Sequence, residues 1–172
     1  MMMCINNLFK LSVRNNIFAL LLLCAPMAGF ADNAKHQNDF FDHYYLQAGT
    51  YMHYTDSDDY TGSKIFTSIE GVKSNDWLYG LALFDNSFGQ FSQYIYTGTS
   101  WNYHGKFEGF HTKLTAGFIH GYRGDYKDKI PLNNLGIGPA IIPGIGYDNG
   151  KYGADIIMLG GAGLLFTVGT HL

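Results

Sequence analysis

Three side chains of the types that carry out acyl transfer lie near the ends of two predicted strands. His53 lies in the stretch TYMHY, while Asp85 and Ser87 lie in the stretch FDNSFGQ, with Asn86 between them. A serine hydroxyl becomes a nucleophile when a histidine takes its proton and a third group orients that histidine. The sequence therefore makes His53, Asp85 and Ser87 candidates for a catalytic site, with Ser87 as the nucleophile.

Each candidate also has a simpler interpretation. Asp and Ser are common in turns because their side chains bond to nearby backbone. His53 can be a solvated residue at a strand end, and His120 is a rival base because it lies near the end of another predicted strand at the same rim. Asn86 can replace Asp85 as the orienting group. The sequence leaves these alternatives open.

The segments that must position these residues are predicted as strands of about ten residues, the pattern of an outer-membrane barrel. Their apolar residues alternate with period two. In the fifth segment, for example, Leu114 and Phe118 fall on one face and Lys113 on the other. The eight predicted strands are residues 40–54, 64–72, 77–84, 90–101, 107–122, 136–147, 152–160 and 163–172.

The connections between these segments fall into two sets. Those after the second, fourth and sixth strands are short, and Asn149-Gly150 is a strong hairpin signal. The other set includes the long polar ones, as in barrels with short periplasmic turns and longer outer loops. This arrangement predicts an all-β, eight-stranded antiparallel transmembrane β-barrel with His53, Asp85 and Ser87 at one rim. A soluble lipocalin-like barrel is the alternative, but the 13 Tyr and 13 Phe favour a membrane protein.

The first 31 residues have the features of a secretory signal peptide. Lys10 and Arg14 precede the apolar run 17–23, and the small residues of AGFA follow at 28–31. Cleavage after Ala31 would leave residues 32–172 as a single barrel domain in the outer membrane. Both cysteines, Cys4 and Cys24, lie in the leader, so the mature chain is expected to have no disulfide and no thiol nucleophile.

Charge and composition limit the kinds of molecule that we expect the protein to bind. A formal net charge of -3 gives no electrostatic basis for nucleic-acid binding. No cluster of metal ligands is evident, since the acidic residues 56–59 suit a solvated loop, and we expect neither a metal nor another cofactor. We expect a membrane-embedded monomer.

Three stretches resemble the lipid A palmitoyltransferase family (PagP), in a divergent branch: WLYGLALFDNSFGQF, TYMHY and LTAGFIHGYRGDYKDKIPL. The resemblance covers most of the predicted mature chain. It implies an eight-stranded barrel that moves a palmitoyl chain from the sn-1 position of a phospholipid donor to a lipid A acceptor. It assigns the family's histidine to His53, its aspartate to Asp85 and its serine to Ser87. In the family the aspartate and serine are adjacent, whereas Asn86 separates them here.

Other residues suggest how such a barrel would handle lipids. Pro139 and Pro143 in the sixth strand cannot donate to a ladder, which predicts either a lateral gate or a bulge. Inward-facing glycines would set the depth of a pocket, and basic residues in the long loop can pair with phosphate. The candidates are Gly80, Gly98 and Gly117 for the pocket, and Arg123, Lys127 and Lys129 for the phosphate.

Two other functions fit the same barrel. An outer-membrane phospholipase would use the same residues with water as the acceptor. A non-catalytic small barrel, serving adhesion, membrane stability or transport, would not use them at all.

Overall fold

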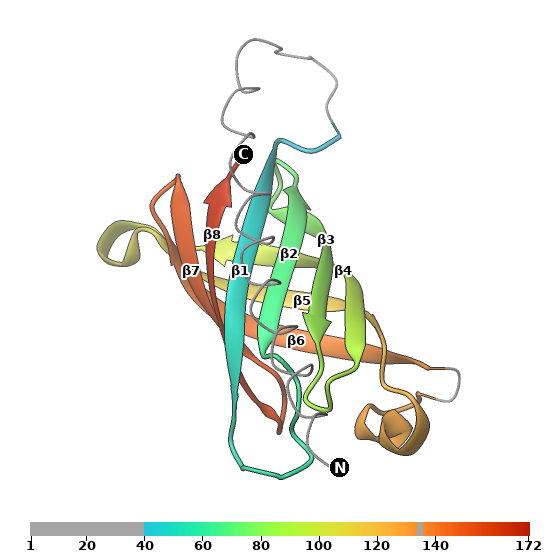
Figure 1. Ribbon diagram of the computed structural model, residues 1–172. Helices are drawn as coiled ribbons and strands as arrows, with labels where there is room; N and C mark the ends of the chain where they lie inside the picture. Colours follow the sequence, from blue (N-terminus) through green and yellow to red (C-terminus); the bar gives the residue numbers. More distant parts are fainter. Residues whose placement is uncertain (1–39, 134–135) are drawn as a thin grey trace, which may run out of the picture. The chain divides into compact units, whose positions relative to one another are not determined.

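A computed structural model describes residues 40–133 and 136–172 of the chain. The described residues form a closed antiparallel barrel in which each strand pairs with the next and β1 pairs with β8 (Figure 1). The predicted signal peptide lies outside the described residues. The strands are β1 (His43–His53), β2 (Ile65–Val72), β3 (Trp77–Asp85), β4 (Phe91–Asn102), β5 (Phe110–His120), β6 (Ile137–Asp148), β7 (Tyr152–Met158) and β8 (Gly163–His171).

The predicted fold class and the number of strands are confirmed. Most strand ends differ from the predicted ones by only a few residues. The fifth strand starts later than predicted because the short 3₁₀ helix η2 (Gly105–Phe107) lies in the connection before it. A second 3₁₀ helix, η3 (Gly124–Lys129), lies in the long connection between β5 and β6. Within the described ranges, none of the helices has the length and apolar character needed to span a bilayer.

We call the end of the barrel where β1, β3, β5 and β7 finish the loop end, and the opposite end the turn end. The loop that follows β1, the turn that follows β3 and the loop that contains η3 all lie at the loop end (Figure 1). His53 and Asp85 are the last residues of β1 and β3, so the barrel brings them to the same end.

The barrel surface is apolar and its interior is polar. In β5, Leu114 and Phe118 are exposed, whereas Lys113 and Thr115 on the other face are buried. Large apolar side chains are exposed on all eight strands, with Ile95 at 64% and Ile141 at 73%. This distribution is the one expected when lipid, and not water, surrounds the strands. The alternation therefore supports the transmembrane barrel over the soluble one.

Charged side chains inside the barrel are paired. Lys113 Nζ donates to Glu70 Oε2 at 2.9 Å, and the Tyr96 hydroxyl donates to Glu70 Oε1 at 2.9 Å. Nearer the turn end, His111 and Asp155 lie 2.7 Å apart. A charge taken from water is costly unless it is paired and hydrogen-bonded, so these contacts are what allow a charged interior in so small a barrel.

One seam of the barrel is only partly closed. On its β5 side, β6 is paired along most of its length, from Ile137 to Tyr147. On its β7 side, pairing covers only residues 144–148, opposite 153–157. Within the described residues, the loop-end half of β6 therefore has no ladder partner in β7, and Pro139 and Pro143 both lie in that half.

The buried pair predicts an asymmetric response to substitution. Lys113→Met leaves the Glu70 carboxylate buried without its cation, which should lower the free energy of unfolding by about 3–5 kcal/mol. Adding Glu70→Gln should recover much of that loss, because no charge is then left unpaired. Urea unfolding in detergent micelles measures both values, with exposed Lys151→Met as the control. Equal losses in the single and double variants would contradict a stabilising charge pair.

Candidate active site

The structure brings His53 and Ser87 together. His53 Nε2 lies 2.7 Å from Ser87 Oγ, although His53 ends β1 and Ser87 lies in the turn after β3, a strand that does not pair with β1. This is the distance needed for a histidine to accept the proton of an attacking serine hydroxyl. The contact predicted from residue types and topology is therefore present, while the chemistry assigned to it stays a prediction.

Ser87 is presented by a turn built around Asn86. The Asn86 side chain is 1% exposed, and its Oδ1 accepts the backbone N–H groups of Phe88 and Gln90, each at 3.0 Å. The Asn86 backbone N–H donates to the Gln90 carbonyl at 2.9 Å. An asparagine that satisfies nearby backbone in this way fixes the turn. Ser87 follows directly and is held at the apex.

The orienting group expected for His53 is not where the sequence predicted it. The Asp85 carboxylate accepts a hydrogen bond from the Ser63 hydroxyl at 2.6 Å, and the Asn86 side chain accepts hydrogen bonds from the backbone of the turn. Neither side chain hydrogen-bonds to His53 in the part of the chain that the structure describes. The intervening Asn86 explains the difference, because it places Asp85 at the strand end and Ser87 in the turn. The rival base, His120, contacts Arg123 at 3.2 Å instead of Ser87.

Aromatic rings surround His53 instead. The Tyr60 ring stacks on the imidazole with centroids 4.0 Å apart and planes 22° apart. The Tyr51 ring meets it edge-on, with centroids 5.1 Å apart and planes at 88°. Sequence reasoning missed Tyr60, although an aromatic residue in the otherwise polar stretch TDSDDYTGS was a signal for it.

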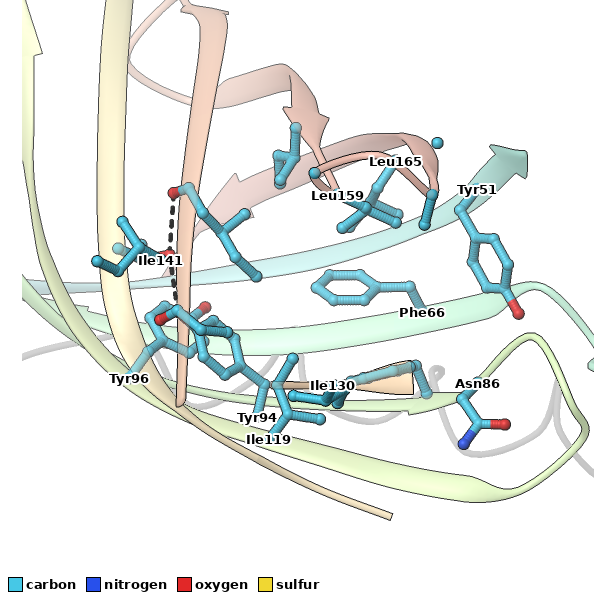
Figure 2. A pocket seen from close by; sticks show the side chains of 18 of the residues that line it. Tyr51, Phe66, Asn86, Tyr94, Tyr96, Ile119, Ile130, Ile141, Leu159 and Leu165 are labelled. Atoms are coloured by element: carbon cyan, nitrogen blue, oxygen red, sulfur yellow. Dashed lines mark hydrogen bonds between the residues drawn. The ribbon is translucent and has the colours of Figure 1, made fainter. Parts of the chain in front are cut away.

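The His53–Ser87 pair lies at the mouth of an internal cavity of about 630 Å³. Tyr51 and Asn86 lie at one end of this cavity, and Tyr94 and Tyr96 lie toward the other (Figure 2). Apolar side chains such as Phe66, Leu159 and Leu165 line the space between. The volume falls within the range of roughly 300–1,000 Å³ typical of small-molecule sites. Its lining suits one flexible hydrocarbon chain better than a polar ligand.

Aromatic and charged side chains close the deep end of the cavity. The rings of Tyr94 and Tyr96 stack with centroids 4.6 Å apart, and the Tyr94 hydroxyl lies 3.2 Å from Thr115 Oγ1. A Cβ at Gly80 would overlap the Tyr96 ring, so the glycine leaves the space that this ring occupies. Gly98 and Gly117 also face inward, but there a Cβ would meet neighbouring backbone.

A second, more polar cavity of about 960 Å³ opens at the turn end. His43, His111 and His171 are among its lining residues. Glu70 and Lys113 line both cavities, so their ion pair lies between them.

The long β5–β6 connection covers part of the mouth. The Gln90 side chain forms two hydrogen bonds to this connection. It accepts one from the Arg123 backbone N–H at 3.0 Å and donates one to the Arg123 carbonyl at 3.2 Å. The Phe88 ring stacks on Tyr126 at 3.9 Å, with Lys129 Nζ 5.7 Å from the Phe88 centroid. Burial and the nearby phenols of Tyr51 and Tyr60 raise the pKa of Tyr122 to about 12, so this phenol at the cavity keeps its proton.

Lys129 and Ile130 from this connection line the cavity. Of the predicted phosphate-binding residues, Lys129 thus reaches the cavity directly. No three His, Cys, Asp or Glu side chains within residues 40–133 and 136–172 are grouped so as to hold a metal ion.

Comparisons with known proteins give little beyond this geometry. No family model matches the chain, and no curated protein sequence matches it significantly. Among solved structures, the chain is similar to the outer membrane protein Ail of Yersinia pestis, determined in a phospholipid bilayer nanodisc. The two share 11% sequence identity with a TM-score of 0.39, over 76% of this chain and 99% of Ail. The fold assignment therefore rests on the strand pairing and burial described above.

The cavity makes a prediction about ligand binding. Ile142 lines the cavity, whereas Ile145 on the same strand is exposed at 57% on the outer face. Ile142→Trp should fill the cavity and weaken binding of a fluorescent polyunsaturated fatty acid by about tenfold or more, a change of roughly 1.4 kcal/mol. Ile145→Trp should leave the fluorescence titration unchanged. Equal affinities for both variants would show that the fatty acid binds elsewhere.

Proposed function

We propose that the protein is an outer-membrane acyltransferase that moves a palmitoyl chain from a phospholipid to lipid A. The observation that carries the proposal is the 2.7 Å contact between His53 and Ser87 at the mouth of a cavity lined by apolar side chains. A nucleophile and base at the entrance to a hydrocarbon-sized space are the arrangement that acyl transfer from a lipid requires. The resemblance of TYMHY and FDNSFGQ to the lipid A palmitoyltransferases adds the donor and acceptor.

The proposed reaction has two halves. In the first, Ser87 Oγ attacks the ester carbonyl of the donor and His53 takes the serine proton. His53 then returns that proton to the departing glycerol oxygen, which leaves a lysophospholipid and an acyl-serine. In the second, His53 takes a proton from a lipid A hydroxyl as its oxygen attacks the acyl-serine carbonyl. The same proton passes to Ser87 Oγ, and the serine is regenerated.

The partly closed seam offers the donor a route from the membrane. The cavity is lined on this side by Pro139, Ile141 and Ile142 from the unpaired half of β6, and by Leu159 beyond β7. An acyl chain can enter sideways here without breaking a complete ladder. The two prolines suit such a gate because they have no N–H groups to leave unpaired.

The orientation proposed for the barrel places the loop end outward, with both ends of the mature chain on the periplasmic side. The outer leaflet then supplies the acceptor near the cavity mouth. Lys129 at the mouth, with Arg123 and Lys127 on the same connection, can pair with lipid phosphates.

Two other functions remain candidates. A phospholipase would share the first half-reaction and use water in the second, so only the product distinguishes it. A non-catalytic barrel is favoured by one observation, namely that no carboxylate hydrogen-bonds to His53 among the described residues. The acyltransferase is preferred because a buried hydrocarbon-sized cavity beneath a Ser–His contact has no evident use in a purely structural barrel.

Substitutions at the Ser–His pair test the function. Ser87→Ala and His53→Asn should each abolish lipid A palmitoylation, and the double variant should lose no more than either single one, because the two groups act as a unit. Asp85→Asn should keep partial activity, because the Asp85 carboxylate holds Ser63 in the loop beside the pair but makes no hydrogen bond to His53 among the described residues. Mass spectrometry of lipid A measures the product, and a lysophospholipid and fatty-acid assay detects a hydrolase.

The matched controls are Ser100→Ala and His104→Ala, which lie at the turn end. Heat-modifiable gel migration in the membrane fraction should show that every variant is folded and inserted. A folded Ser87→Ala variant that palmitoylates lipid A at the parent rate would end the case for Ser87 as a nucleophile.

Cross-linking tests the seam. Pro143→Cys with Met158→Cys continues the β6–β7 register one step beyond Gly144 and Ile157, so their disulfide should close the gap and block activity until it is reduced. Tyr147→Cys with Ala154→Cys joins residues that are already paired and should have no effect. Full activity of the oxidised seam variant would show that lipid enters elsewhere.

A further inference from the structure

His53 is held on its ring faces and edges by aromatic side chains. Tyr60 lies nearly parallel to the imidazole at 4.0 Å, and Tyr51 stands perpendicular to it at 5.1 Å. The contact to Ser87 uses Nε2. A stacked ring therefore limits the imidazole to the plane in which Nε2 reaches the serine hydroxyl.

In Ser–His–Asp sites a carboxylate holds the histidine through its second ring nitrogen. Here the carboxylate that the resemblance assigns to this role, Asp85, is bonded to Ser63. The described hydrogen bonds of His53 comprise the Ser87 contact alone. Another kind of contact can therefore orient the His53 ring. Of its two aromatic contacts, the stacked Tyr60 ring is the closer one.

Tyr60 is itself fixed by the loop that carries it. Its backbone N–H donates to the Ser57 carbonyl at 3.0 Å, and its ring meets Phe88 with centroids 5.7 Å apart. Two residues later, the Gly62 N–H donates to the Ser87 carbonyl at 3.2 Å. A Cβ at Gly62 would collide with the backbone oxygen of Asn86, so the loop lies directly against the serine turn. One loop therefore holds both the base and the nucleophile.

We propose that Tyr60 is the positioning residue of the His53–Ser87 pair, and that its stacked ring performs the orienting role that a carboxylate performs through the second ring nitrogen in Ser–His–Asp sites. The inference rests on the acyl transfer proposed above. The ring acts twice: it fixes the orientation of the neutral imidazole, and its negative face attracts the imidazolium formed when His53 takes the proton. Neither effect needs the Tyr60 hydroxyl.

The test compares Tyr60→Ala with Tyr60→Phe, using exposed Tyr54→Ala in the same loop as the control. Loss of the ring should lower kcat by about a hundredfold, since a displacement of about 1 Å at a reacting group has that effect, while the KM for the phospholipid stays unchanged. Tyr60→Phe and Tyr54→Ala should keep the parent kcat. A drop in Tyr60→Phe equal to that in Tyr60→Ala would overturn a role for the ring face.

Two readouts do not depend on a lipid acceptor. NMR in micelles should show the His53 Cε1 proton shifted upfield by the Tyr60 ring in the parent and Tyr60→Phe, and not in Tyr60→Ala. Labelling of Ser87 by a fluorophosphonate should slow in Tyr60→Ala in parallel with that shift. If labelling responds in this way while no variant, including the parent, palmitoylates lipid A, then the positioning role stands and the proposed acceptor is wrong. Folded Tyr60→Ala that labels at the parent rate overturns the positioning role.

Discussion

Closure of the ladder by the pairing of β1 with β8 is the constraint on which the site depends. In lipid every backbone N–H and C=O must find a partner within the protein, so an open sheet cannot persist there. An eight-stranded barrel is a small closed sheet, and its interior has room for side chains or for one slender ligand. The narrow circumference brings the ends of β1 and β3 close enough for His53 to reach Ser87 across β2.

The incomplete pairing between β6 and β7 is subject to the same constraint. Unpaired backbone between β6 and β7 would be costly at membrane depth, and the cost is lower where Pro139 and Pro143 remove two donors. In the proposed function, chemistry and access therefore lie on different parts of the barrel: His53 and Ser87 lie at the ends of β1 and β3, while β6 and β7 border the proposed entry route. The apolar cavity connects the two.

The sequence predicted what depends on local pattern and missed what depends on loop contacts. Period-two alternation predicted the strands and placed Lys113 and Phe118 on opposite faces; in the structure Lys113 faces the interior and Phe118 the outside. Residue types and the predicted topology were enough to predict that His53 and Ser87 lie close together. The orienting role of Asp85 could not be judged from the sequence, because its carboxylate bonds to Ser63, which lies 22 residues earlier in the loop between β1 and β2. The stack of Tyr60 on His53 and the short β6–β7 pairing depend likewise on non-local contacts.

The ion pair between Glu70 and Lys113 determines how the interior of the barrel is divided. Because the pair lines both internal cavities, it is the partition between a chamber that opens at one face of the membrane and a chamber that opens at the other. The two hollows therefore meet at paired side chains and not at an open passage along the barrel axis. Where the surrounding bilayer contains hydrocarbon alone, the barrel thus separates its two hollows with an ion pair beside the stacked rings of Tyr94 and Tyr96.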